Sequence, residues 1–163
     1  MRSEDLKISE LNGVYAVEVR GRANFDYAVP LRELSGKLSE ASQLSIDLTN
    51  CEAMDSTFMG VLTMLALKFR KRGLQVVLAG AGENLLKLLR DLGVAKLFKC
   101  VERNEAVSGN KIETSGAADM LTTAETVAEA HKALVGADAG NAEKFKQVIE
   151  FADKDVERLK KTH

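Results

Sequence analysis

The sequence predicts an α/β fold in which a mixed, mostly parallel sheet is flanked by helices on one side, followed by a C-terminal helical hairpin. One observation is the order of apolar segments, which alternate between strand-like and helix-like spacing as β-β-α-β-α-β-α-β. The other is the Asn12-Gly13 dipeptide between the first two strands, which is typical of a tight β-hairpin. With 163 residues, 45% of them hydrophobic and 29% charged, the chain can build a globular core.

The first half of the chain contains the hairpin, one helix and a buried strand. Pro30, the only proline, suits the first turn of a helix that runs to about Ala41. The expected strands are 6–8, 14–19 and 44–48.

The second half continues the alternation. A helix begins at Asp55-Ser56, because both are good N-cap residue types, and it ends at Gly73. Phe58, Val61, Leu62, Leu65 and Phe69 lie on its apolar face. The remaining elements are a strand at 76–79, a helix at 83–93 and a strand at 97–101.

Three regions are expected from these patterns. Residues 1–102 form the α/β domain, and 103–121 form a polar, glycine-containing linker. Residues 122–163 form a helical hairpin, whose first helix starts at the capping-box pattern Thr122-Thr123-Ala124-Glu125 and whose second starts at Asn141. The hairpin has an apolar stripe, so it must pack on the domain or on another subunit.

Charge and composition exclude several functions. The formal net charge is −1, which gives no basis for expecting nucleic acid or a membrane surface as a partner. The N-terminus is polar and no apolar run is long enough to span a bilayer, so we expect a cytoplasmic protein. Cys51 and Cys100 are far apart, and His131 and His163 lack nearby ligands at metal spacing. We therefore expect no metal and no cofactor, and we place His131 on a solvated or partner-facing helix surface.

Ser56 is the candidate functional residue. A hydroxyl at the start of a helix lies near the positive end of the helix dipole, where the fold tolerates a phosphate. The competing interpretation is that Ser56 only caps the helix. If Phe58 faces outward, it is an aromatic anchor for a partner beside Ser56.

Three other chemistries receive little support. Gly80-Ala81-Gly82 lacks the third glycine of a dinucleotide motif, and a tight turn explains it better. Ser56 could act as a hydrolytic nucleophile only if the fold brought a base such as His131 to it, and enzymatic activity is not expected. Asp47 and Asp55 could together bind Mg²⁺, but two carboxylates near a strand end are weak evidence.

The element order, with Ile46-Asp47-Leu48-Thr49, Met54-Asp55-Ser56-Thr57 and Leu78-Ala79-Gly80, resembles the STAS family, the anti-sigma-factor antagonists and related domains of bacteria. The run Leu85 to Phe98 also resembles that family, and the likeness covers about Leu6 to Val101. The resemblance implies a STAS-like (SpoIIaa-like) fold.

It also implies a regulatory function. In the family the serine after the aspartate is phosphorylated by a partner kinase, often the anti-sigma factor itself, and a phosphatase reverses this. The unmodified antagonist binds the anti-sigma factor and frees a sigma factor for transcription. The phosphorylation site carried over is Ser56, and the expected partner-binding residues are Asp55, Ser56, Thr57, Phe58 and Met59.

Two points stay open at this stage. Family members commonly have glycine shortly after the serine, whereas this chain has Phe58 and keeps only Gly60, which bears on partner choice. The alternative function is a constitutive scaffold or dimerisation module, with a homodimer through the C-terminal helices and Ser56 acting only as a helix cap.

Overall fold

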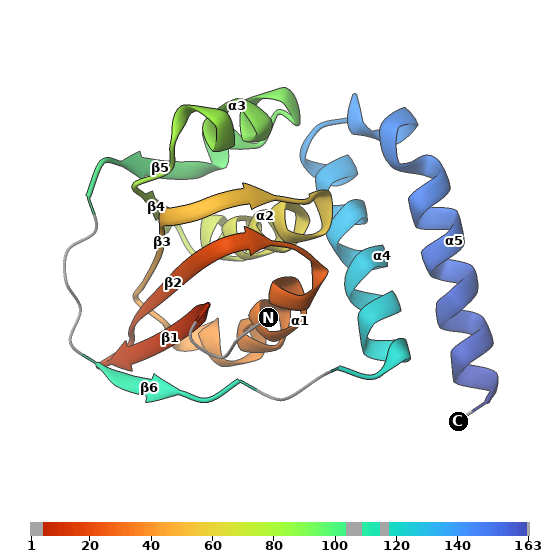
Figure 1. Ribbon diagram of the computed structural model, residues 1–163, viewed down its shortest axis with the longest axis horizontal. Helices are drawn as coiled ribbons and strands as arrows, with labels where there is room; N and C mark the ends of the chain where they lie inside the picture. Colours follow the sequence, from red (N-terminus) through yellow and green to blue (C-terminus); the bar gives the residue numbers. More distant parts are fainter. Residues whose placement is uncertain (1–4, 104–108, 115–117, 163) are drawn as a thin grey trace.

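The structure is a computed structural model that describes residues 5–103, 109–114 and 118–162, and it confirms the predicted α/β architecture (Figure 1). One six-stranded sheet has the order β5-β4-β3-β2-β1-β6. The strands are β1 Leu6–Leu11, β2 Val14–Ala23, β3 Gln43–Met54, β4 Val76–Ala79, β5 Phe98–Val101 and β6 Asn110–Ile112. The helices are α1 Phe25–Leu34, α2 Ser56–Lys71, α3 Glu83–Asp91, α4 Met120–Ala137 and α5 Asn141–Lys161, with short 3-10 helices at Ser35–Glu40 and Ala95–Leu97.

The sheet is mixed and mostly parallel, as expected. β2, β3, β4 and β5 run parallel to one another, and β1 is antiparallel to both β2 and β6. At the β1–β2 turn Asn12 has φ 51° and Gly13 has φ 84°. Two successive residues with positive φ are what a two-residue hairpin turn requires, which explains the Asn-Gly pair.

The first helix begins earlier than predicted. It starts at Phe25, capped by the side chain of Asn24, and Pro30 lies inside it rather than in its first turn. The prediction was wrong because it used proline as the start signal and passed over Asn24, whose side-chain oxygen accepts from the backbone N–H of Asp26 at 2.9 Å.

The segment expected to be a linker contributes two pieces of regular structure. Asn110–Ile112 forms β6, which pairs with β1 at the sheet edge. Met120 begins α4, whose N-cap is Asp119 rather than the Thr122 capping box. Asp119 accepts from the backbone N–H of Thr122 at 2.7 Å, so the aspartate satisfies the helix end that the threonines were expected to satisfy.

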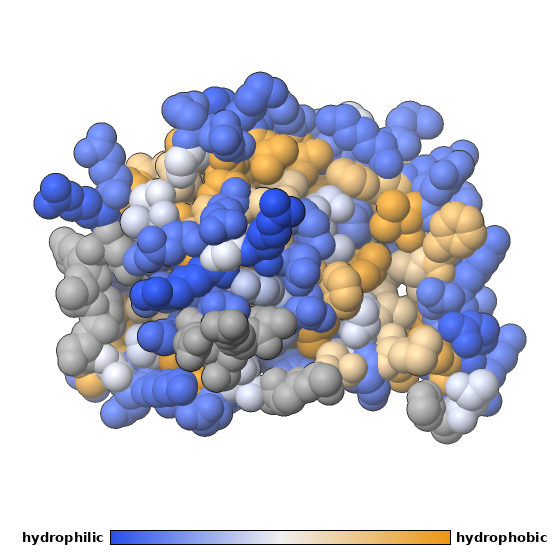
Figure 2. Space-filling model, in the orientation of Figure 1, coloured by the Kyte–Doolittle hydropathy of each residue, from blue (hydrophilic) through white to orange (hydrophobic). Residues whose placement is uncertain are grey.

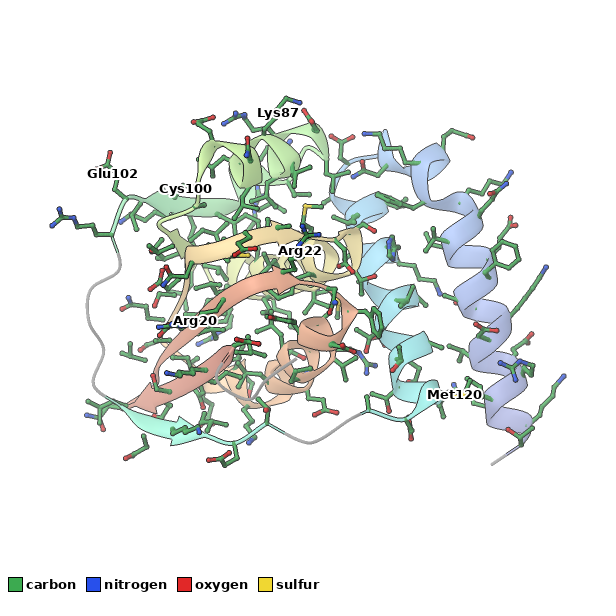
Figure 3. The ribbon with its side chains drawn as sticks, viewed as in Figure 1. Arg20, Arg22, Lys87, Cys100, Glu102 and Met120 are labelled. Atoms are coloured by element: carbon green, nitrogen blue, oxygen red, sulfur yellow. The ribbon has the colours of Figure 1, made fainter. Side chains whose placement is uncertain are left out.

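The helical hairpin α4–α5 packs on the domain itself. Ala130 and Leu134 of α4 belong to the same buried cluster as the strands and α2. In Figure 1 the arrowheads of β2 and β3 point toward α4, so the hairpin lies at the end of the sheet where α1 and α2 begin. Arg20 and Arg22 of β2 are exposed on the sheet (Figure 3). Within the described residues, no helix has both the length and the apolarity that crossing a membrane requires.

Candidate functional site

The candidate site lies at the first turn of α2. β3 continues to Met54, where it pairs with Ala23 of β2, and the chain then turns into the helix. Asp55 is the N-cap: its carboxylate accepts from the backbone N–H of Phe58 at 2.8 Å, and its own N–H donates to the carbonyl of Ala23 at 3.0 Å. Burial raises the pKa of Asp55, while that hydrogen bond and others act in the opposite direction. The cap is therefore Asp55, and Ser56 is free for another role.

Ser56 makes its hydrogen bond to the C-terminal hairpin. Its Oγ lies 2.8 Å from Nε2 of His131 on α4, and the Ser56 side chain is partly exposed. Nδ1 of His131 lies 2.7 Å from the carbonyl oxygen of Val127. A backbone carbonyl can only accept, so Nδ1 carries the proton and Nε2 is the acceptor. The Ser56 hydroxyl therefore donates to His131.

His131 is held neutral in this position. Its side chain is 2% exposed, and burial is the main cause that lowers its pKa below the ordinary value. The ring of Phe145 from α5 meets the imidazole edge-on, with centroids 4.9 Å apart. The expectation of a solvated or partner-facing histidine was wrong. Its spacing could have shown this, because His131 lies seven residues after buried Ala124 and three before buried Leu134.

The fold thus joins Ser56 and His131, which are 75 residues apart in the sequence. The polarity of the bond is that of a serine beside a general base. The group that orients His131 is a carbonyl rather than a carboxylate, and the ring is buried between α2 and α5. This arrangement holds the hydroxyl in place and closes it off on the hairpin side.

The proposed partner-binding surface is smaller than the sequence suggested. Thr57, Phe58 and Met59 are 7%, 0% and 5% exposed. The Phe58 ring packs edge-on against Tyr27 of α1, with centroids 6.4 Å apart. Phe58 is therefore a core residue and no exposed anchor, because its position in the first turn points between α2 and α1. Asp55 and Ser56 are the two partly exposed members of the expected set.

Close backbone packing and ion pairs hold helix α4 against this region. A Cβ built on Gly60 of α2 would lie 2.3 Å from the carbonyl oxygen of Ala130, so the two backbones are in direct contact. Arg32 of α1 forms ion pairs with Glu125 and Glu129 of α4. The hydrogen bond that Arg32 Nε donates to the Glu129 carboxylate is the main cause that raises the pKa of Arg32.

A second anchor lies at the other end of the hairpin. Asn141 is 2% exposed, and its Nδ2 donates to the carbonyls of Leu92 at 2.9 Å and Leu134 at 2.8 Å. These bonds join the turn after α3, the end of α4 and the start of α5. Nearby, Asp138 lies so close to Gly93 that a Cβ there would meet its Oδ2 at 1.9 Å.

Two weaker hypotheses can be compared with the geometry. Gly80 has φ 71°, and a Cβ there would meet Thr49 Oγ1 at 2.1 Å, so the glycine serves a tight turn. The adjoining cavity of about 290 Å³ is lined by Glu52 and Glu83, which disfavours a phosphate. Asp47 and Asp55 lie eight residues apart along an extended strand, roughly 25 Å at the usual rise per residue, so they cannot share one Mg²⁺.

The family model described as "Mlab, STAS domain" matches residues 8–100. No match was found among curated proteins.

Solved structures share the fold at low sequence identity. The unphosphorylated form of the anti-sigma factor antagonist SpoIIAA is 8% identical with a TM-score of 0.51, and the match covers 63% of this chain and 89% of that one. A Thermotoga maritima protein assigned as an anti-sigma factor antagonist is 14% identical with a TM-score of 0.52, covering 60% and 86%. Both matches have the expected SpoIIAA-like fold, and the family match spans more than half of the sequence. The chain therefore belongs to the STAS domain family.

Proposed function

We propose that this protein is a non-enzymatic, phosphorylation-regulated binding module of the anti-sigma-factor antagonist type, with Ser56 as the phosphorylated residue. The observation that supports this most is the placement of Ser56. This partly exposed residue lies in the first turn of α2, directly after the Asp55 cap, at the end of the sheet where β3 runs into the helix. The unmodified form binds a serine-protein kinase or anti-sigma factor, and a cognate phosphatase restores it.

The electrostatics of the site suit such a switch. A phosphate on Ser56 adds about −1.5 to −2 charges at neutral pH, and the N-terminus of α2 favours that charge. The neighbouring Asp55 carboxylate adds further negative charge on the same surface. A partner that fits the neutral hydroxyl would then meet a charge it cannot solvate, at a cost of about 2–5 kcal/mol in a desolvated interface.

The test is partner affinity as a function of charge at residue 56. Kinases of the anti-sigma type from the native host are titrated calorimetrically with the wild type, Ser56→Ala and Ser56→Asp. We expect Ser56→Asp to bind at least roughly tenfold more weakly, and Ser56→Ala to bind without being phosphorylated. Ser39→Asp is the matched control, because it adds the same charge at an exposed residue of the 3-10 helix Ser35–Glu40. Equal affinities for all four proteins would reject the proposal.

A constitutive assembly module is the second candidate, and the outer face of α5 favours it. Val148 and Phe151 are 37% and 66% exposed on this helix. Figure 2 shows hydrophobic surface gathered over α4 and α5. The inner face of the hairpin is used within the chain, so a homodimer would form through the outer face of α5. A dimer that Phe151→Ser converts to monomer, measured as mass in solution across a concentration series, would support this function.

A further inference from the structure

The surface around Ser56 is already occupied by a segment of the same chain. Ser56 and Gly60 are four residues apart in α2 and therefore lie on the same face of the helix. Helix α4 lies on that face: Ala130 contacts the backbone at Gly60, and His131 bonds Ser56. A protein that approached Ser56 from the hairpin side would compete with α4 for the same space.

The hydrogen bond to His131 depends on the hydroxyl proton. Nδ1 of His131 already donates to Val127, so Nε2 offers only a lone pair toward Ser56. Once Oγ is esterified it carries no proton, so the bond from Oγ to Nε2 is lost. The anionic oxygens of the phosphate would face that lone pair, with the half-buried Asp55 carboxylate nearby.

The packing between α2 and α4 close to Ser56 is also tight. The α2 and α4 backbones touch one turn away from Ser56, where a single Cβ on Gly60 would be 2.3 Å from an oxygen of Ala130. Ala130 is 0% exposed and His131 is 2% exposed. Close-packed helices at this distance cannot admit a tetrahedral phosphate without separating.

We infer that the hairpin α4–α5 is an intramolecular lid on Ser56, and that a phosphate on Ser56 and a docked α4 are mutually exclusive. The unmodified serine holds the lid closed through His131, and phosphorylation opens it. The inference rests on the proposed function only in taking Ser56 as the phosphorylated residue. It adds an intramolecular output, because opening exposes the buried faces of α2 and α4.

The experiment places phosphoserine at residue 56 of the full chain during synthesis, so it needs neither kinase nor partner. Amide hydrogen exchange is then followed along α4 and, as a check on folding, along β3. We expect protection in α4 to fall by roughly tenfold or more relative to the unmodified protein, while β3 stays protected. Phosphoserine at residue 39, an exposed site, is the control and should change neither element.

Two results would overturn the inference. One is unchanged protection in α4 with phosphoserine confirmed at residue 56. The other is increased protection together with a raised pKa of His131 by NMR, which would mean that a protonated imidazole pairs with the phosphate and tightens the lid. The proposed function is judged separately: charge-dependent partner affinity can fail while the lid opens, and it can succeed while the lid stays closed.

Discussion

The contact between Gly60 and Ala130 provides a direct test of how α4 is held. Replacing Gly60 with alanine places a Cβ 2.3 Å from the carbonyl oxygen of Ala130, 2.6 Å from its carbonyl carbon and 2.7 Å from its Cβ. Ordinary contact begins near 3.4 Å, so α4 must move away by about 1 Å. The clashing atoms include helix backbone, which has no rotamer to change.

Two effects of opposite sign set the magnitude. Alanine is about 1 kcal/mol better than glycine inside a helix. Overpacking a closely fitted contact costs about 1–3 kcal/mol. Gly136 of α4 separates the two effects, because a Cβ there would meet nothing within 4 Å. Gly136→Ala therefore gains the helix propensity without the clash, and the difference between the variants reports the steric cost alone.

The assay is urea unfolding of the wild type, Gly60→Ala and Gly136→Ala. We expect Gly136→Ala to be the more stable variant, by about 1–3 kcal/mol over Gly60→Ala. For a chain of this size that corresponds to roughly 2–12 °C in melting temperature. Hydrogen exchange should show loss of protection in α4 for Gly60→Ala only. If the two alanine variants unfold at the same urea concentration, α4 does not pack on Gly60 as described.

Three further outcomes are expected. Ser56→Ala leaves Nε2 of His131 buried without a donor, so the free energy of unfolding should fall by about 1–3 kcal/mol in urea titrations. Asn141→Ala removes two buried hydrogen bonds and should cost about 2–3 kcal/mol by the same measurement, with wild-type stability arguing against the anchor. Because burial lowers the pKa of His131, the unfolded state binds the proton more readily, and this contribution to stability is complete above the ordinary pKa of 6.5 and is lost as pH falls below it. The raised pKa of Asp55 has the opposite effect, because it lowers stability as the pH rises above 3.8, the ordinary value. The measurement therefore compares the free energy of unfolding of wild type and His131→Phe between about pH 7.5 and 5.5. In this range the stability of the variant should depend less on pH.

The fold could be predicted largely because its signals are local. The cap at Asp55, the turn at Asn12-Gly13 and strand β4 each depend on a few neighbouring residues, and the structure confirms them. β6 was missed because three residues, two of them polar, carry almost no periodicity, and the strand exists only through its pairing with β1. The start of α1 was misplaced because proline was given more weight than the stronger Asn24 cap.

The candidate site was predictable only in part. The spacing of Phe58 with Val61 and Leu62 already placed it on the apolar face of α2, and the structure agrees with that pattern rather than with an exposed anchor. The link from Ser56 to His131 could not be predicted, because it depends on how α4 crosses α2. The only local clue was the position of His131 on the buried stripe of α4.

The contacts that hold the hairpin on the domain differ in strength and burial, and this difference decides which part of α4 would move. The ion pairs of Arg32 join partly exposed groups, so each contributes about 1 kcal/mol or less. Asn141 is buried at the turn between α4 and α5, where it donates to the carbonyls of Leu92 after α3 and of Leu134 near the C-terminal end of α4. Of the contacts described, the one at Ser56 is the one that a phosphate would abolish. Phosphorylation should therefore release the middle of α4 while the Asn141 end stays in place as a hinge. In the phosphoserine protein, amide exchange should accordingly rise most around His131 and least around Leu134, and uniform loss of protection along α4 would count against a hinge at Asn141.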